Sequence, residues 1–292
     1  MVGFDQMEAT GRDTCGGSRA HDGRPLDRVD LGEGIVVWQS TQLREHGVNH
    51  AFTTRHGGDS SELKASLDLA GRGSRTGADL VAAEANLERL REQLDVAESD
   101  RTLLLHQIHG KEIFIDDGAP RSWPPPRADI LISNRPDGFL MVRVADCVPI
   151  LLHDPASGAV AAVHSGWRGT VADAPGATVE AMREQYGTKP ERLIAAIGPA
   201  IGIDHFEVGD EVASAFRDSG LSDCVRAGDP RPHVDLHAAV HTRLLQADLD
   251  VKHIDGDRIC SHASTLDCFS YRRDGPEGGR MAAVIQAVAK SG

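Results

Sequence analysis

Short apolar runs that alternate with longer amphipathic segments constrain the fold of this chain more than any other feature. Runs such as GIVVWQS, FLMVRVA and VPILLHD have the length of buried strands, and polar or turn residues bound each of them. Between two such runs, the segment 77–94 places apolar side chains at helical spacing: Leu80, Ala83, Leu87, Leu90 and Leu94. The alternation predicts a chain built from both strands and helices.

The connections between the apolar runs indicate how the strands pair. HDPASG joins two runs, and TLLLHQIHG and KEIFIDD are predicted to meet at a turn of His109 and Gly110. Connections this short join antiparallel strands, whereas parallel strands need a long crossover. Further helices are predicted in VADAPGATVEAMREQYG, GDEVASAFRDSG and VDLHAAVHTRLLQADL, the last one capped by Asp235. We predict one mixed α/β domain over residues 31–292, preceded by a disordered polar tail over residues 1–30.

Charge and composition exclude several classes of function. The 292 residues carry a formal net charge of −13, and a nucleic-acid-binding surface would need clustered Lys and Arg, so no nucleic-acid partner is expected. No run reaches about eighteen apolar residues, which argues against a membrane span and a membrane partner. The five cysteines are odd in number and widely spaced, unlike a disulfide framework. We therefore expect a cytoplasmic protein.

Three residues that end apolar runs are candidates for one site: Cys147, His164 and His109. Two imidazoles and a thiolate give zinc three protein ligands and leave a fourth position for water, as in catalytic zinc sites. A Cys–His hydrolase is the competing interpretation, with Cys147 as nucleophile, a histidine as base, and Asp146 or Gln107 as helper. The residues alone leave both open, together with the simpler alternative that all three are ordinary core side chains.

Arginines beside glycine-rich turns are candidates for binding an anion. Arg55 in TTRHGG and Arg168 in HSGWRG flank turns where a backbone can approach a phosphate and a guanidinium can hold it. The segment SYRRDGPEGGR, which contains Arg273, is either a second anion-binding element or a charged loop. His237 and His241 share one face of a predicted helix, but an ordinary amphipathic helix is favoured because no carboxylate accompanies them.

Eight short motifs occur in one order along the chain: FTTRHGG, HQIHG, ADCVPILL, HSGWRGT, IGPAIG, FEVGDEV, DLHAAV and FSYRRDGPEGGRMAAVI. Together they resemble the YfiH-like, or laccase-domain, family over roughly residues 35–290. This family was once labelled multicopper polyphenol oxidase and is now regarded as purine nucleoside phosphorylase-like. The chain departs from the family at Ala200, where many members have cysteine, and at Asp68, where asparagine is usual.

The resemblance implies a fold, a metal site and an activity. The implied fold is a single-domain α/β/β/α layered sandwich with mixed sheets, related to cysteine-hydrolase-like domains. The implied zinc ligands are His109, Cys147 and His164, with copper as an alternative metal. The implied activity is phosphorolysis of adenosine, inosine, guanosine and methylthioadenosine, together with deamination of adenosine. The expected partners are a nucleoside and phosphate, and a homodimer remains open.

Residue roles follow from that resemblance and from the chemistry it implies. Catalytic roles are expected for Asp146, Cys147 and Arg168, with Asp146 either moving protons or orienting a ligand. Contacts with nucleoside or phosphate are expected from a set of polar residues: Arg55, Gln107, Arg168 and Arg273. Two alternatives are a Cys–His amide hydrolase in peptidoglycan precursor editing and a laccase-like copper activity. The laccase is disfavoured because multicopper oxidation needs several copper centres and the sequence offers one trio.

Overall fold

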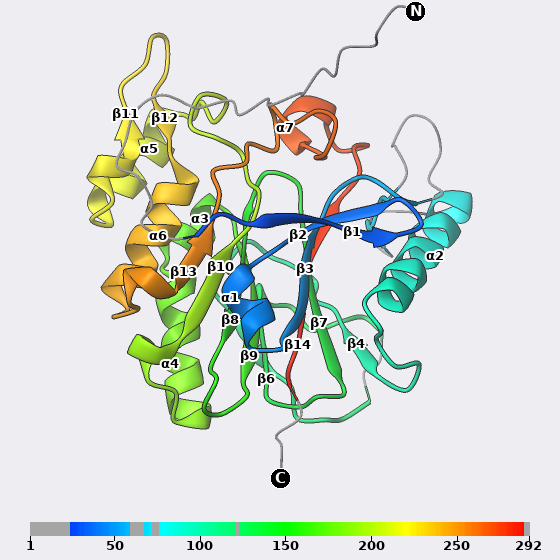
Figure 1. Ribbon diagram of the computed structural model, residues 1–292. Helices are drawn as coiled ribbons and strands as arrows, with labels where there is room; N and C mark the ends of the chain where they lie inside the picture. The colour runs from blue at the N-terminus through cyan, green and yellow to red at the C-terminus, as the bar shows by residue number, and fades with distance from the viewer. Residues whose placement is uncertain (1–23, 59–66, 72–75, 121–122, 289–292) are drawn as a thin grey trace, which may run out of the picture.

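Two six-stranded sheets form the centre of the protein (Figure 1). The computed structural model describes residues 24–58, 67–71, 76–120 and 123–288. The first sheet has the order β1 (Asp27–Gly32), β2 (Ile35–Gln39), β3 (Asn49–Thr53), β14 (Met281–Gln286), β7 (Gly138–Val144) and β4 (Arg101–Leu103). The second has the order β13 (Ile254–Gly256), β10 (Ile194–Ile197), β8 (Val148–His153), β9 (Val160–Ser165), β6 (Ile130–Ser133) and β5 (Ile113–Ile115). A small separate sheet pairs β11 (Val225–Arg226) with β12 (His233–Val234).

Helices cover the outer face of each sheet, so the layers run α/β/β/α. In Figure 1, α2 (Gly77–Gln93) lies on the side of the first sheet, and α4 (Ala174–Tyr186) and α6 (Leu236–Gln246) lie on the side of the second. The remaining helices are α1 (Thr41–Glu45), α3 (Trp167–Val171), α5 (Asp210–Asp218) and α7 (Tyr271–Asp274), with short 3-10 turns at Pro190–Arg192, Ser222–Cys224 and Val251–His253. The mixed α/β domain predicted from the sequence and the layered architecture implied by the family resemblance are both confirmed.

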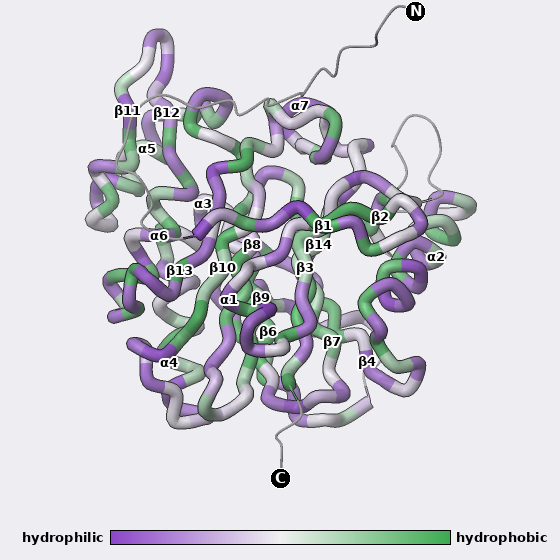
Figure 2. Tube along the Cα trace, in the orientation of Figure 1, coloured by the Kyte–Doolittle hydropathy of each residue, from purple (hydrophilic) through white to green (hydrophobic). Residues whose placement is uncertain are grey.

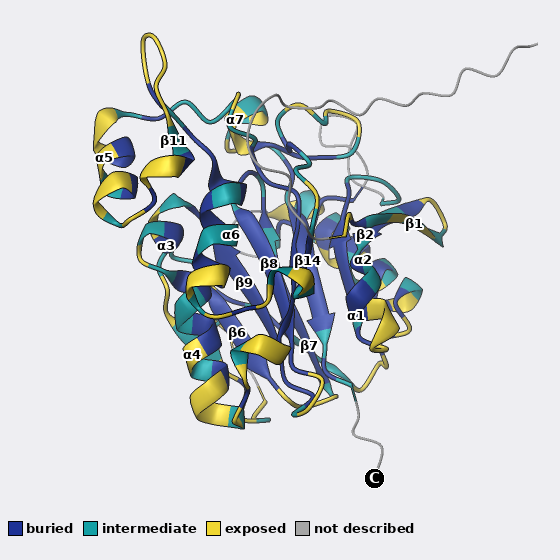
Figure 3. Cartoon of the chain, turned by 60° about the vertical axis from the view of Figure 1, so that its left-hand side comes forward, coloured by how far each residue is buried: buried dark blue, intermediate teal, exposed yellow. Residues whose placement is uncertain are grey.

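The strands β8 and β9 are buried on both faces, which explains why they read as continuous apolar runs. Ile150 and Leu152 face the helices of the second sheet, whereas Leu151 between them faces the first sheet. Figure 2 shows hydrophobic residues along these central strands, and Figure 3 shows them buried while the outer faces of the helices are exposed. The two central strands therefore give packed, buried support to residues at their ends.

Most elements predicted from the sequence are present. The helix predicted over residues 77–94 is α2, and the three further helices are α4, α5 and α6. Asp235 caps α6, because its carboxylate accepts a hydrogen bond from the backbone N–H of Ala238 at 2.9 Å. The HDPASG turn joins β8 and β9 as an antiparallel pair in which Val148 lies opposite Ser165. That pairing brings the start of β8 next to the end of β9.

The predicted hairpin at His109 and Gly110 is wrong. β4 pairs in parallel with β7 of the first sheet, whereas β5 pairs in parallel with β6 of the second. The chain between them crosses from one sheet to the other. It does so because the backbone N–H groups of residues 108–110 donate to the carboxylate of Asp129 and not to a neighbouring strand.

The predicted boundary between tail and domain also needs correction. β1 covers Asp27–Gly32, so a boundary at residue 30 falls inside a strand. Val29 and Leu31 of this strand pack against the core on the α2 side, which the polar residues around them concealed in the sequence. Residues 1–23 of the predicted tail lie outside the described residues. No helix within the described part of the chain is long and apolar enough to cross a membrane.

Candidate metal centre and its pocket

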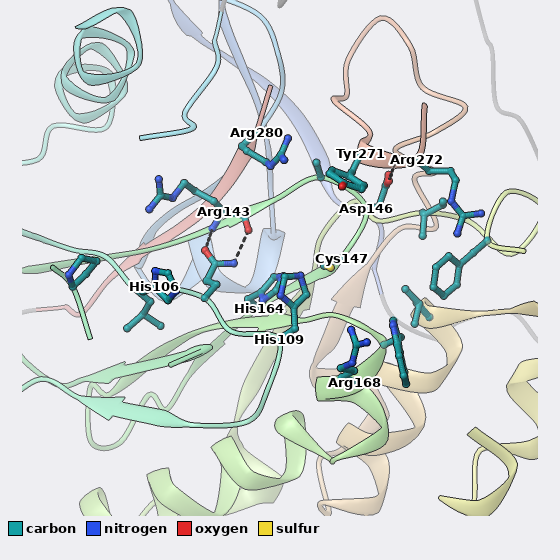
Figure 4. Close-up of a pocket in the computed structure, with 18 of the residues that line it drawn as sticks. His106, His109, Arg143, Asp146, Cys147, His164, Arg168, Tyr271, Arg272 and Arg280 are labelled. Carbon is teal, nitrogen blue, oxygen red and sulfur yellow. Dashed lines mark hydrogen bonds between the residues drawn. The ribbon is translucent and has the colours of Figure 1, made fainter. Parts of the chain in front are cut away.

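The structure brings His109, Cys147 and His164 together. Cys147 lies in the turn between β7 and β8, and His164 lies near the end of β9, opposite Pro149 of β8. One potential ligand atom of each residue lies within 4.8 Å of the other two. The imidazole rings of His109 and His164 meet edge to face, with their centroids 4.9 Å apart. Figure 4 shows the three side chains converging from separate segments of the chain.

A buried aspartate that sequence reasoning missed organises two of these three residues. Asp129, which is 0% exposed, precedes β6. Its Oδ1 accepts a hydrogen bond from the backbone N–H of His109 at 3.0 Å, and its Oδ2 accepts one from Gly110 at 2.7 Å. These bonds hold His109 at a φ of 61°, in the left-handed region that non-glycine residues seldom adopt. The same carboxylate lies 2.8 Å from Nδ1 of His164 and so orients its ring.

The protonation of the cluster follows from these contacts. Burial alone would raise the pKa of the Cys147 thiol, but the charge of His164 and hydrogen bonds from His109 and His164 lower it to about 6. Burial alone would lower the pKa of His164, but the Cys147 thiolate and the hydrogen bond with Asp129 raise it. Burial would likewise raise the pKa of Asp129, and its hydrogen bond with His164 lowers it. The cluster therefore favours a thiolate, which is the form of cysteine that binds metals and attacks electrophiles.

The donor set fits a transition metal ion. Two imidazole nitrogens and one thiolate sulfur are the ligand types that zinc and copper prefer, and they differ from the oxygen-rich sites of magnesium and calcium. Exposure increases from His164, which is buried, through Cys147 to His109, which is exposed. The side of the cluster that faces the cavity is therefore accessible to a further ligand, as a catalytic metal site requires.

A cavity of about 620 Å³ lies against the cluster, and all three residues contribute to its lining. Its size lies in the range of pockets that bind small molecules. Two kinds of side chain dominate the rest of the wall: Arg143, Arg168, Arg272 and Arg280, and Trp123, Trp167, Phe206 and Tyr271. The cavity is thus cationic and aromatic inside a chain whose formal net charge is −13.

Two of the predicted substrate-binding residues line this cavity. Arg168 is exposed in the first turn of α3, and its guanidinium carbon lies 4.4 Å from the ring centroid of Trp167. Gln107 also lines the wall, but its side-chain amide is engaged by the backbone of Arg143. Its Nε2 donates to the carbonyl of Arg143 at 2.8 Å, and its Oε1 accepts from the N–H of Arg143 at 2.9 Å. The side chain of Gln107 therefore holds the backbone of Arg143 in the cavity wall.

The other two predicted residues, Arg55 and Arg273, do not line the cavity. Arg55 donates to the carbonyl of Thr265 at 2.9 Å and stacks on Phe269. Arg273 donates to backbone carbonyls of the loop before α7, including that of His262 at 2.8 Å. Glycine-rich turns drew attention to both arginines, yet their guanidinium groups hold the protein's own backbone. The sequence motifs contained the cavity arginines Arg272 and Arg280, but spacing did not distinguish them from Arg273.

Asp146 holds other parts of the chain through its carboxylate. It is 9% exposed and has a φ of 90°. One carboxylate oxygen accepts a hydrogen bond from Ser261 Oγ at 2.6 Å, and the other accepts from the backbone N–H of Arg272 at 2.7 Å. Both carboxylate oxygens are thus engaged by the protein. The bond to Arg272 connects Asp146 to the segment that contains α7. The predicted role of Asp146, moving protons or orienting a metal ligand, stays a prediction.

His237 and His241 lie on α6, as predicted, and His237 is buried there. Among the residues that the structure describes, the one group of three or more metal-ligating side chains is His109, Cys147 and His164. His237 and His241 do not belong to that group.

The fold and the site together define a class: a layered two-sheet α/β protein with a His–Cys–His group of metal ligands in the lining of a cationic, aromatic cavity. The chain belongs to the family described as multi-copper polyphenol oxidoreductase laccase, which matches residues 49–288. The family resemblance drawn from the motifs is thereby confirmed.

Individual relatives cover nearly the whole domain. The chain is 38% identical to a purine nucleoside phosphorylase of Deinococcus radiodurans over 84% of this chain and 91% of that protein. It is 35% identical to the purine nucleoside phosphorylase YfiH of Escherichia coli K12 over 87% of this chain and 99% of that protein. Among solved structures, YlmD from Geobacillus stearothermophilus is 29% identical, with a TM-score of 0.80 over 91% of this chain and 100% of that one.

Proposed function

We propose that the protein is a zinc-dependent purine nucleoside phosphorylase that acts on adenosine, inosine, guanosine and methylthioadenosine and also deaminates adenosine. The observation that carries this proposal is the His109–Cys147–His164 cluster in the wall of a cavity of small-molecule size that also contains Arg168. Relatives named purine nucleoside phosphorylases, which are 35–38% identical over most of both chains, support it. Its partners would be a nucleoside and phosphate in the cytoplasm, and its catalytic unit the single folded domain.

Phosphorolysis transfers the ribosyl group from the purine base to phosphate. Phosphate attacks the anomeric carbon, the glycosidic bond breaks, and the base leaves with the bonding electrons and takes up a proton. Arg168 would bind the phosphate, and its stacking on Trp167 limits how far the guanidinium moves. Zinc held by His109, Cys147 and His164 would supply Lewis acidity and lower the pKa of a water molecule, which also suits replacement of the adenine amino group by water.

A Cys–His amide hydrolase, such as one that edits peptidoglycan precursors, is the second candidate function. The lowered pKa of Cys147, about 6, favours it because a thiolate beside an imidazolium is the resting state of many cysteine nucleophiles. A laccase-like copper activity has less support, since the described residues contain one three-ligand cluster and multicopper oxidation needs several centres. Copper in the place of zinc would account for a weak side activity.

Metal analysis combined with a nucleoside screen tests the proposal. We expect about one zinc per chain, base release from nucleosides only when phosphate is present, and loss of both zinc and activity in Cys147→Ser. Cys224→Ser is the matched control, because Cys224 is buried outside the cavity lining and should keep its zinc. Full amide hydrolysis by metal-free protein, without phosphorolysis, would favour the hydrolase instead.

The same assay tests the role of Arg168. Arg168→Ala should raise the KM for phosphate by about 10- to 100-fold, the worth of one charged hydrogen bond of about 1.5–3 kcal/mol. Arg183→Ala is the control, because Arg183 is an exposed arginine of α4 that pairs with Glu180 away from the cavity. An unchanged phosphate dependence in Arg168→Ala would remove Arg168 from the mechanism.

A further inference from the structure

Tyr271 is an aromatic residue of the cavity wall that does not pack against the hydrophobic core. It lines the cavity and is 52% exposed. Trp167 and Phe206 line the same cavity, but both pack against the hydrophobic core of the second sheet. Tyr271 belongs to none of the three hydrophobic clusters formed by the described residues. A large apolar ring in a cavity wall without a packing role is a candidate for ligand contact.

The backbone of Tyr271 is held firmly although its ring is exposed. Tyr271 begins α7, whose N-cap Ser270 accepts a hydrogen bond from the N–H of Arg273 at 3.3 Å. The next residue, Arg272, donates its N–H to the carboxylate of Asp146 at 2.7 Å. Asp146 precedes Cys147 directly, so one carboxylate connects the metal-ligand turn to the segment that contains Tyr271. The backbone position of Tyr271 relative to the metal-ligand turn is therefore set by the fold before a substrate binds.

A guanidinium lies beside the ring and restricts its orientation. The guanidinium carbon of Arg280 is 5.5 Å from the ring centroid of Tyr271. Arg280 is itself held, because its Nη1 donates to the carbonyls of Gly278 at 2.7 Å and Gly279 at 2.9 Å. Figure 4 shows Tyr271 beside Arg280 and Asp146, near Cys147. The result is a planar, preoriented aromatic surface close to the candidate metal ligands.

We infer that Tyr271 forms the base-binding subsite, where the heteroaromatic base of the substrate stacks on its ring while the sugar lies toward the cluster. This inference rests on the proposed nucleoside phosphorylase function, and it assigns recognition of the base to one residue. Stacking suits this task because every purine presents a flat π surface, so a ring selects for planarity and tolerates different substituents. The phenolic hydroxyl is not needed for stacking, so the ring and not the hydroxyl determines the affinity.

Direct binding of hypoxanthine to the zinc-loaded full chain tests the inference without requiring turnover. By isothermal titration calorimetry, Tyr271→Ala should weaken hypoxanthine binding by about 10- to 100-fold, and Tyr271→Phe should bind as the wild type does. With inosine as substrate, Tyr271→Ala should raise the KM for the nucleoside by a similar factor and leave the KM for phosphate unchanged. Leu266→Ala is the control, since Leu266 is 80% exposed on the preceding loop and does not line the cavity.

Each outcome supports or overturns the subsite. Unchanged hypoxanthine binding in Tyr271→Ala, or no binding by the wild type, would overturn it. Trp123 is the other half-exposed aromatic residue in the wall. Loss of binding in Trp123→Ala but not in Tyr271→Ala would also overturn the subsite. Tyr271→Leu, which keeps apolar bulk without an aromatic plane, replaces the alanine variant if that one loses zinc or melts early. Failure of phosphorolysis alongside Tyr271-dependent base binding would refute the proposed function and support the subsite. Normal phosphorolysis with hypoxanthine binding that does not depend on Tyr271 would support the proposed function and refute the subsite.

Discussion

Two buried aspartates in this protein each accept several hydrogen bonds, but one network leads to candidate metal ligands and the other to a helix N-terminus. Asp129 and Asp255 are both 0% exposed. Asp129 accepts from the backbone of residues 108–110 and contacts His164, so its network ends in a cluster of metal ligands open to a cavity. Asp255 of β13 accepts from Ser40 Oγ at 2.6 Å and from the N–H of Gln42 at 3.1 Å, so its network ends in the N-terminus of α1.

The histidine in each network shows what the difference means. His164 is held against a carboxylate and a thiolate, which outweigh burial and raise its pKa. His50 accepts a hydrogen bond from the N–H of Ser40 at Nε2 and contacts the carbonyl of Val48, and burial lowers its pKa to about 4. Burial alone therefore does not make a histidine functional. A histidine becomes a candidate ligand when a carboxylate fixes one nitrogen and the other faces a second ligand.

Among the substitutions that test the contrast between the two networks, Asp129→Asn should have the largest effect, and that effect should fall on metal binding. The amide would present an NH₂ group to backbone N–H donors and would no longer fix the ring of His164. We expect zinc affinity to fall by about 10- to 100-fold, as for other residues that orient metal ligands. Competition with a chromophoric chelator measures this. Zinc affinity equal to that of the wild type, in a variant that remains folded, would show that Asp129 only supports the loop of residues 108–110.

Asp255→Asn is the matched isosteric change in the other network, and its effect should fall on stability. It removes the charge that strengthens the hydrogen bonds joining β13 to α1, at an expected cost of about 2 kcal/mol in the free energy of unfolding. Urea denaturation of metal-free protein measures the cost, and zinc affinity of the folded variant should be unchanged. If Asp255→Asn weakened zinc binding as much as Asp129→Asn, the two networks would be coupled and the contrast between them would be lost.

Much of the fold could be predicted from the sequence because local pattern and burial agree there. β8 and β9 are covered on both faces, so their sequences are apolar throughout, and the HDPASG turn sets their pairing. β1 was missed because the polar residues of DRVDLG conceal a strand with one half-buried face. The connection from β4 to β5 was predicted as a hairpin because a short apolar run does not indicate which strand it pairs with. Each of these two strands pairs with a strand distant in the sequence.

The candidate site could be predicted only in part, for a related reason. His109, Cys147 and His164 were identifiable because each ends an apolar run and family motifs contain them. Asp129 was not, since an aspartate at the start of a strand looks like an ordinary boundary residue until its three backbone donors are in place. Arg55 and Arg273 were assigned to a ligand because sequence shows which arginines lie beside glycines but not which carbonyls already accept their N–H groups.

The smallest effect concerns the pH dependence of stability that His50 contributes. The pKa of His50 is about 4 in the folded protein against a reference value of 6.5, so the unfolded chain binds the proton more readily. Its contribution is complete above pH 6.5 and declines as the pH falls toward 4, reaching a loss of about 1.4 kcal/mol at pH 5.5. Urea denaturation at pH 5.5 and 7.5 should show a decline in stability that is about 1.4 kcal/mol larger in the wild type than in His50→Gln. His153, whose pKa burial also lowers to about 4, contributes equally to both proteins, and removing zinc keeps metal binding out of the comparison. An identical decline in both proteins would mean that protonating His50 does not destabilise the fold. The contrast between a neutral His50 and a His164 with a raised pKa would then be lost.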